Sequence, residues 1–297
     1  MYCSTFRFLF LSVGILCSCL PSQGQTPDAA PFEISGSEVQ TIQSDILDRN
    51  YDLYIKLPPG YNAKENADRS YPIIYFNDAG YNWLTAVGVT RAPFNHGGYE
   101  PAILVGFSYA KGERGVASRV RDYTPTQDPE WRRFETGGGE QYLAFIKTEA
   151  IPRVEAKYRA DPRRRTLVGH SLGGLFGAYV LLKEPSLFSG YILSSPSLWF
   201  HDEIIFEAEE DSANSRFVPR GKVFISVGST ETPALNGGGH DMVGQAIAFA
   251  EALRSRGYQD LEVRDVIYDG GTHLTTFPLA LTEALRWLLP GEDIYGG

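Results

Sequence analysis

Cysteine is scarce in this chain and confined to one end of it. The 297 residues include three cysteines, Cys3, Cys17 and Cys19, all within the first 19 positions. If that segment is removed during maturation, the remaining chain contains no thiol. Disulfide bonds, thiolate zinc sites and cysteine nucleophiles are then excluded from the mature protein.

The chain also lacks a long hydrophobic run and an excess of positive charge. It contains no stretch of about 18 apolar residues, which argues against a polytopic membrane protein. Its 27 basic residues are outnumbered by 36 acidic ones, for a net charge of −9. Because a protein that binds nucleic acid through its phosphates needs a positive surface, we expect no nucleic-acid partner.

The N-terminal segment has the layout of a secretory signal. Arg7 precedes a short apolar stretch at 8–20, which is followed by polar residues at 21–25. The apolar part is too short to span a bilayer, and Ser22 and Gly24 suit the small-residue positions of a cleavage site after Gly24. We therefore predict a signal peptide over 1–24 and an exported mature chain, periplasmic or extracellular.

Two other interpretations of this segment stay open. It could form a buried N-terminal helix of the folded domain. Alternatively, 16–19 is a loose form of the lipobox of bacterial lipoproteins, with a cysteine at an unusual position. In that case Cys19 carries a lipid anchor and the protein is held at a membrane.

The rest of the chain has the pattern of one α/β domain. Residues 25–33 are polar and contain proline, which predicts a disordered lead-in, and no linker or repeat divides 34–297. Short apolar runs, typical of strands buried on both faces, alternate with helical stretches. This alternation predicts a mostly parallel central sheet flanked by helices on both faces. The predicted strands are 51–57, 73–76, 102–105, 166–168, 191–193, 223–227 and 261–268, and the predicted helices are 139–158, 172–183, 243–256 and 276–288.

Two of these segments carry a more specific expectation. Residues 51–57 alternate polar and apolar side chains, which favours an exposed or edge strand. Pro152 lies inside the helix predicted at 139–158. Because a proline in a helix interior loses a hydrogen bond and clashes with the preceding turn, we expect two helical pieces there.

The strongest functional motif is 169–174, Gly-His-Ser-Leu-Gly-Gly, which lies between a predicted strand and a predicted helix. This is the context of the G-x-S-x-G nucleophile elbow of α/β-hydrolases. The flanking glycines leave room for a strained turn that exposes the serine hydroxyl, and the helix N-terminus favours developing negative charge. Ser171 is the predicted nucleophile. His170 should point away from the base.

A serine nucleophile needs a base, and the chain has five histidines. His170 belongs to the elbow, and His96 and His201 follow loops where no base is expected. His273 follows the last predicted strand, in a glycine-rich turn where this fold places its base. His240 is interpreted as a helix-start residue near the rim of the cleft, with a direct substrate role as the alternative.

The third member of a triad would be a carboxylate after the penultimate strand. Glu231 is the first choice there, because it follows the strand at 223–227. Asp241 lies further along the same connection and is the reserve, whereas Asp202 would require the acid to follow an earlier strand. Such an acid orients the imidazole and stabilises its cation.

The oxyanion hole is expected to combine two backbone N–H groups. One belongs to the residue after the nucleophile, Leu172. The other lies in the loop after the strand at 73–76, where Ala79 is the predicted donor because small residues let a carbonyl approach the backbone.

Several of these segments together resemble the putative esterase family of α/β-hydrolases, and within it the enterobactin-esterase-like branch of siderophore esterases. The resemblance runs from Ser37 to Leu289. It rests on 71–75 with Asp78, 121–125 (Arg-Asp-Tyr-Thr-Pro), 169–174, 194–199 (Ser-Ser-Pro-Ser-Leu-Trp), 228–231 and His273.

The resemblance implies roles for further residues. Arg121 would lie at the cleft and bind an anionic or catecholate oxygen, with an ion pair to Asp122 as the equal alternative. Trp199 would form an aromatic wall with Phe200, unless both pack in the core. Some members of this branch work with a Ser–His pair alone, so a triad with Glu231 and a dyad both stay open.

The predicted function is that of a secreted serine esterase acting through an acyl-enzyme, with siderophore trilactone esters as the first substrate class. A carbohydrate acyl esterase for feruloyl or acetyl groups is the alternative. An acyltransferase and a non-catalytic binding protein of the same fold are the remaining alternatives. The scattered histidines offer no pair at helical spacing for a metal, and we expect no cofactor. The oligomeric state stays open.

Overall fold

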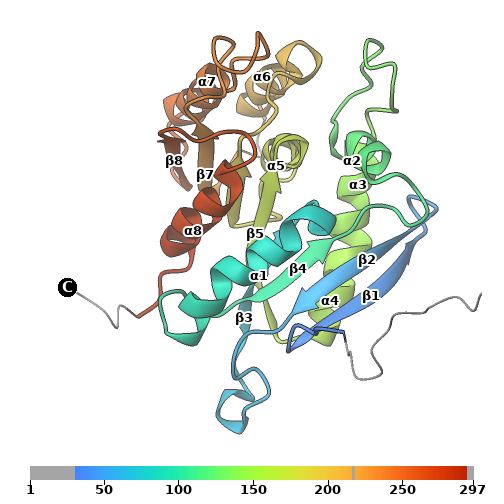
Figure 1. Cartoon of the computed structure of the whole chain (residues 1–297), viewed down its shortest axis with the longest axis vertical. Coiled ribbons are helices and arrows are strands. Elements are labelled where there is room, and N and C mark those ends of the chain that lie inside the picture. The colour runs from blue at the N-terminus through green and yellow to red at the C-terminus, as the bar shows by residue number, and fades with distance from the viewer. Residues whose placement is uncertain (1–30, 216–217, 293–297) are drawn as a thin grey trace, which may run out of the picture. The chain divides into compact units, whose positions relative to one another are not determined.

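Eight strands form one sheet within residues 31–215 and 218–292, the part of the chain that the computed structural model describes (Figure 1). The predicted signal peptide, the anchor at Cys19 and most of the predicted lead-in lie outside these residues. The strands are β1 (Ser37–Ser44), β2 (Arg49–Lys56), β3 (Tyr71–Phe76), β4 (Ile103–Phe107), β5 (Ala160–His170), β6 (Gly190–Ser194), β7 (Gly221–Gly228) and β8 (Leu261–Tyr268).

The order of the strands across the sheet is β1-β2-β4-β3-β5-β6-β7-β8. β1 and β2, and likewise β2 and β4, pair antiparallel, whereas every pair from β4 to β8 is parallel. The carboxyl ends of the parallel strands therefore meet at one edge, which is where ligands bind in open α/β sheets. In the register of the sheet, His170 at the end of β5 lies beside Ser194 at the end of β6.

Helices connect the parallel strands. They are η1 (Lys64–Asn66), α1 (Ala79–Asn95), α2 (Gly115–Tyr123), α3 (Gly139–Phe145), the π-helical turn η2 (Ile146–Ala150), α4 (Ile151–Lys157), α5 (Leu172–Lys183), α6 (Phe200–Ala213), α7 (Met242–Ser255) and α8 (Thr276–Leu288).

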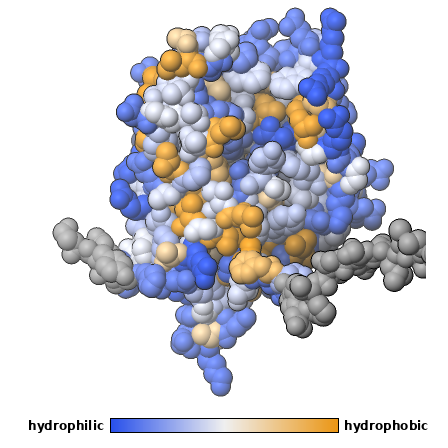
Figure 2. Space-filling model, in the orientation of Figure 1, coloured by the Kyte–Doolittle hydropathy of each residue, from blue (hydrophilic) through white to orange (hydrophobic). Residues whose placement is uncertain are grey.

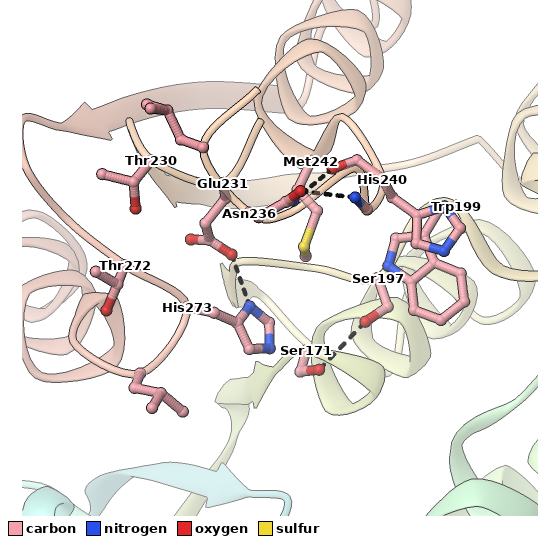
Figure 3. A pocket seen from close by; sticks show the side chains of 13 residues that line it. Ser171, Ser197, Trp199, Thr230, Glu231, Asn236, His240, Met242, Thr272 and His273 are labelled. Atoms are coloured by element: carbon pink, nitrogen blue, oxygen red, sulfur yellow. Dashed lines mark hydrogen bonds and ion pairs between the residues drawn. The ribbon is translucent and has the colours of Figure 1, made fainter. Parts of the chain in front are cut away.

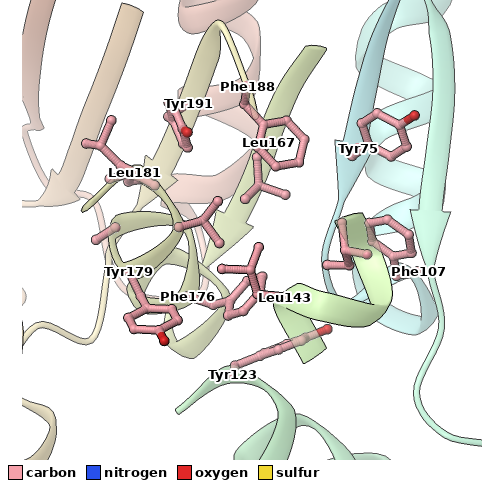
Figure 4. Packing of buried hydrophobic residues seen from close by; sticks show 14 of the residues in the cluster. Tyr75, Phe107, Tyr123, Leu143, Leu167, Phe176, Tyr179, Leu181, Phe188 and Tyr191 are labelled. Carbon is pink, nitrogen blue, oxygen red and sulfur yellow. The ribbon is translucent and has the colours of Figure 1, made fainter. Parts of the chain in front are cut away.

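The helices cover both faces of the sheet. Successive side chains of a strand point to opposite faces. On one face, strand residues such as Tyr75 and Leu167 join a core cluster with residues of α3, α5 and α7 (Figure 4). On the other, α1 and α8 lie across the sheet (Figure 1), where the Phe224 ring of β7 packs against Trp287 of α8. The predicted three-layer α/β architecture is confirmed.

The predicted strand at 51–57 is present as β2, but it is not an edge strand. β1 pairs along its full length and becomes the outer strand. The alternation in 51–57 has another cause: Tyr51, Leu53 and Ile55 are fully buried, and the residues between them are partly exposed. A half-buried strand gives the same pattern as an edge strand, and the prediction that it lies at the edge was wrong.

The segment around Pro152 is also more continuous than expected. α3 and α4 are joined by the π-helical turn η2, and Pro152 lies in the first turn of α4. Pro152 has no N–H to donate to the turn before it, and the wider π-helical winding of η2 lies directly before it and accommodates the lost bond. The helical path therefore runs on through 139–157, with a local change of winding in place of a break.

Figure 2 shows one face, on which hydrophilic side chains predominate and hydrophobic ones gather in small groups. Among the described residues, no helix combines the length and the apolar character needed to cross a membrane.

Candidate active site

Ser171, the predicted nucleophile, occupies the turn between β5 and α5. Its backbone has φ 60° and ψ −123°, which non-glycine residues rarely adopt. A Cβ on Gly169 would lie 1.9 Å from the carbonyl oxygen of Gly173, and one on Gly174 would lie 3.0 Å from Cα of Pro196. Larger residues at these two positions would force the turn apart, so the glycines are needed for the backbone to pack this closely.

Glu231, the first choice for the acid, contacts the predicted base. Its Oε2 lies 2.6 Å from Nδ1 of His273 (Figure 3). Its Oε1 accepts hydrogen bonds from the Ser195 hydroxyl at 2.7 Å and from the Gly228 N–H at 2.8 Å. Burial favours the neutral acid, but these hydrogen bonds, led by the one from His273, outweigh it and hold the pKa of Glu231 below its usual range. The carboxylate is therefore ionised beside the imidazole.

The reserve acids lie elsewhere. Asp241 is the N-cap of α7, and its carboxylate accepts the Gly244 N–H at 3.0 Å. Asp202 lies in a left-handed turn at the start of α6, with φ 51°. Of the three candidates, Glu231 is the one that the structure brings to His273.

The base and the nucleophile face the same space. Figure 3 shows the His273 ring between Glu231 and Ser171. The Ser171 hydroxyl oxygen lies 3.2 Å from that of Ser197, which is almost fully buried. Among the described residues, the Ser171 hydroxyl is paired with Ser197 and not with His273. A bond between a nucleophile and its base is often long or badly aligned without substrate and tightens when it binds, so a serine mechanism is compatible with this arrangement.

The elbow motif predicted that His170 points away from the base, and this prediction was wrong. The His170 ring packs against that of His273 with the centroids 4.6 Å apart, and its Nδ1 lies 3.1 Å from the Ser194 hydroxyl. Burial, and then the charge that His273 can carry, lower the pKa of His170 to about 4. A neutral His170 can sit against the predicted base without opposing a positive charge on the His273 ring.

This environment predicts a pH effect on stability that belongs to His170. Its pKa is lower in the folded state than the ordinary 6.5, so the unfolded state binds more protons between those values. The free energy of unfolding should therefore fall as the pH drops from about 6.5 towards 4. We expect urea unfolding of wild type to lose about 2 kcal/mol more between pH 7 and 4.5 than that of His170→Gln.

A matched control for this experiment is His96→Gln, which removes an exposed histidine at the end of α1. It should show the same pH dependence as wild type. Equal pH dependence of wild type and His170→Gln would contradict the assignment.

The predicted oxyanion donors both begin a helix. Ala79 is the first residue of α1 and Leu172 the first residue of α5. The first N–H groups of a helix have no intrahelical acceptor and lie at the positive end of its dipole, so they suit a developing oxyanion. The two donors stay a prediction.

The loop that carries Ala79 is held by its neighbour Asp78, which has φ 56°. The Asp78 carboxylate accepts two hydrogen bonds from Arg119, at 2.9 and 3.0 Å, and one from the Tyr109 hydroxyl at 2.8 Å. Its backbone N–H donates to the Tyr123 hydroxyl at 2.9 Å. A Cβ on Gly173 would lie 3.1 Å from Asp78, so this loop packs directly on the elbow.

A pocket of about 560 Å³ opens at the triad (Figure 3). Trp199, expected as an aromatic wall, and His240, interpreted as a helix-start residue near the rim of the cleft, lie in its wall with their rings stacked, parallel and 4.0 Å apart. Trp131 stacks on Trp199 in turn, at 5.9 Å. The lining residues are Ser171, Ser197, Trp199, Thr230, Glu231, Leu235, Asn236, Gly239, His240, Met242, Thr272, His273 and Leu274.

Arg121 occupies the second of its two alternatives, the ion network. Its guanidinium contacts Asp122 at 2.9 Å and Glu113 at 2.5 Å, and Tyr51 donates to Asp122 beside it. Arg121 is not among the residues that line the pocket. Because its charge is already balanced by two carboxylates, it ties α2 to the sheet instead of presenting a free cation to substrate.

Sequence reasoning missed the serines of 194–199 as members of the site. Ser194, Ser195 and Ser197 each contact a different catalytic-site residue. The available signal was three serines directly after a strand that neighbours the elbow strand. Among the described residues, no group of three or more His, Cys, Asp or Glu is placed to hold a metal ion.

Comparison with known proteins agrees with this geometry. The family model described as "Putative esterase" matches residues 44–288. The ferri-bacillibactin esterase BesA of Bacillus subtilis is 30% identical over 281 residues, which cover 90% of this chain and 94% of that protein.

Two solved structures share the fold and much of the length. The BES protein from Bacillus cereus is 27% identical, with a TM-score of 0.74 over 88% of this chain and 99% of that one. An IroE-like serine hydrolase from Shewanella oneidensis is 25% identical, with a TM-score of 0.73 over 85% and 80% of the two chains. The fold is that of the α/β-hydrolases.

Proposed function

Because this chain belongs to the putative esterase family and is a carboxylic ester hydrolase, we propose that it cleaves its ester by a serine mechanism at Ser171. The observation that carries the proposal is the 2.6 Å contact of Glu231 with His273, placed beside a serine on a strained elbow. A nucleophile, a base and a residue that orients the base are the three parts that such a mechanism needs.

The reaction follows from these positions. His273 takes the proton of Ser171 through Nε2 as the hydroxyl oxygen attacks the ester carbonyl. Glu231 holds the ring by Nδ1 and stabilises the imidazolium. The N–H groups of Leu172 and Ala79 stabilise the oxyanion. His273 then protonates the leaving alcohol, and a water molecule, deprotonated by the same histidine, releases the acid from the acyl-enzyme.

The substrate class is proposed to be siderophore esters. One relative is named for ferri-bacillibactin, and the pocket wall formed by Trp199 and His240 offers flat aromatic surface to an aryl group. The alternative, a carbohydrate feruloyl or acetyl esterase, uses the same wall for a feruloyl ring. An assay of wild type on a ferric catecholate trilactone, a feruloyl ester and p-nitrophenyl acetate separates them by the preferred ester. Preference for the trilactone supports the proposal, and preference for the feruloyl sugar ester overturns it.

Trp199→Ala tests the role of the aromatic wall. Loss of one stacked ring is expected to raise KM for esters with an aromatic acyl group about 10-fold, because an aromatic contact contributes roughly 1 kcal/mol beyond buried area, and the area itself is lost as well. KM for p-nitrophenyl acetate should change less than KM for the feruloyl ester, because the acetyl group is small and carries no ring. Trp287→Ala, which removes a tryptophan of α8 that packs on the Phe224 ring, is the control. Equal change in KM for the acetyl and feruloyl esters would contradict the assignment.

Export of the mature chain is also proposed, from the layout of residues 1–24. Mass spectrometry of the purified native protein distinguishes its forms. A chain that begins after Gly24 indicates a secretory signal, a lipid-modified Cys19 indicates an anchored lipoprotein, and an intact N-terminus refutes both.

A further inference from the structure

The segment 194–199, which begins with the last residue of β6, supplies a different hydroxyl to each part of the site. Ser194 contacts His170 at 3.1 Å, Ser195 contacts Glu231 at 2.7 Å and Ser197 contacts Ser171 at 3.2 Å. The three serines are almost fully buried. Buried hydroxyl groups need partners, and here the partners are the catalytic groups and the histidine beside them.

Ser195 is the member of this segment with the most constrained surroundings. Its backbone has φ 41°, and its hydroxyl lies between Oε1 of Glu231 and the hydroxyl of Thr276, 2.8 Å away. A serine hydroxyl has one proton. Because that proton is donated to Glu231, the Thr276 hydroxyl must donate to Ser195. The bonds therefore run in one direction, from Thr276 at the start of α8 through Ser195 to the carboxylate.

Because of these hydrogen bonds, the two carboxylate oxygens of Glu231 have different partners. Oε1 accepts from Ser195 and from the Gly228 N–H, whereas Oε2 is left facing Nδ1 of His273. With both donors on one oxygen, the carboxylate cannot rotate without breaking a charge-assisted bond. Without the Ser195 hydroxyl, the Gly228 N–H would be the one remaining donor to Oε1.

We infer that Ser195 is a positioning residue for the acid of the triad, held in turn by the Thr276 hydroxyl. The inference rests on the proposed serine mechanism. It assigns to the second serine of the Ser-Ser-Pro-Ser-Leu-Trp segment the task of fixing which oxygen of Glu231 meets the base.

A double-mutant cycle with Glu231 tests this role. Ser195→Ala is expected to lower kcat about 10- to 100-fold with little change in KM, as suits a lost hydrogen bond to a charged group. In the Glu231→Ala background the same substitution should change kcat less than about 2-fold, since the hydroxyl then has no carboxylate to position. An equal loss in both backgrounds overturns the inference, because a general structural defect does not depend on Glu231.

Two further variants separate the hydroxyl from the backbone. Ser195→Gly relieves the left-handed φ while removing the hydroxyl, so it should lose as much activity as Ser195→Ala. Wild-type activity in Ser195→Gly overturns the inference. Thr276→Ser keeps the donor and should retain wild-type kcat, whereas Thr276→Val should lose about 3-fold or more. Equal activity of the two Thr276 variants overturns the role of Thr276.

Failure of this inference can be told apart from failure of the serine mechanism. If hydrolysis survives Ser171→Ala, the mechanism itself is refuted. If hydrolysis depends on Ser171 and the cycle shows no coupling, only the role of Ser195 is refuted.

Discussion

Ser171→Ala is expected to lower kcat for ester hydrolysis on the order of 10⁶-fold, the size of loss found when the nucleophile of a serine triad is removed. The structural reason is that Ser171 alone sits on the elbow, with φ 60° at the end of β5, where its hydroxyl meets the His273 side of the pocket (Figure 3). Residual hydrolysis should come from binding and the oxyanion donors alone. Initial rates on the preferred ester, with active-site concentration measured separately, give the ratio.

Ser197→Ala is the matched control for that experiment. The two hydroxyl oxygens are 3.2 Å apart, and both residues line the pocket, so nonspecific damage from removing a hydroxyl should be similar. An organophosphonate should add its mass to wild type and to Ser197→Ala, and should leave Ser171→Ala unmodified. Labelling of Ser171→Ala, or an equal loss of activity in the two variants, would refute Ser171 as the nucleophile.

The predicted site residues that the structure brings together are those whose placement follows from backbone geometry or from chain order. The elbow at 169–174 can be recognised in the sequence because the turn tolerates no side chain at Gly169, where a Cβ would lie 1.9 Å from the carbonyl oxygen of Gly173. His273 and Glu231 were located by topology, since both follow parallel strands at the same edge of the sheet. Such constraints are local or follow from chain order, so a single sequence carries them.

The features that sequence reasoning missed depend on packing between distant segments. Nothing in the residues around His170 shows that its ring meets that of His273, because His170 ends β5 and His273 follows β8, far along the chain. β1 was not predicted, and its pairing with β2 decided that β2 is internal. Arg121 had two equal interpretations, and a carboxylate eight residues away, Glu113, decided between them. Which of several residues a side chain contacts in such cases can be read only from the folded structure.

Glu231→Gln is expected to lower kcat on the order of 10⁴-fold, close to the loss seen when the acid of a serine triad becomes an amide. The amide can still accept the Ser195 and Gly228 hydrogen bonds through its oxygen, so the geometry of 228–231 is preserved. Its NH₂ group then faces Nδ1 of His273, which must act as an acceptor. The proton of the neutral ring moves to Nε2, and the base can no longer take the proton of Ser171.

The same substitution decides between a triad and a Ser–His dyad. Because hydrogen bonds hold the pKa of Glu231 below its usual range, wild type keeps the carboxylate ionised throughout the pH range of catalysis, and the loss in Glu231→Gln should persist at high pH. Asp241→Asn is the matched control: it keeps an N-cap on α7 and should retain wild-type kcat. A loss of less than 10-fold in Glu231→Gln would mean that the imidazole works without an acid. A large loss in Asp241→Asn alone would move the acid to the reserve position, against the 2.6 Å contact on which the proposal of Glu231 rests.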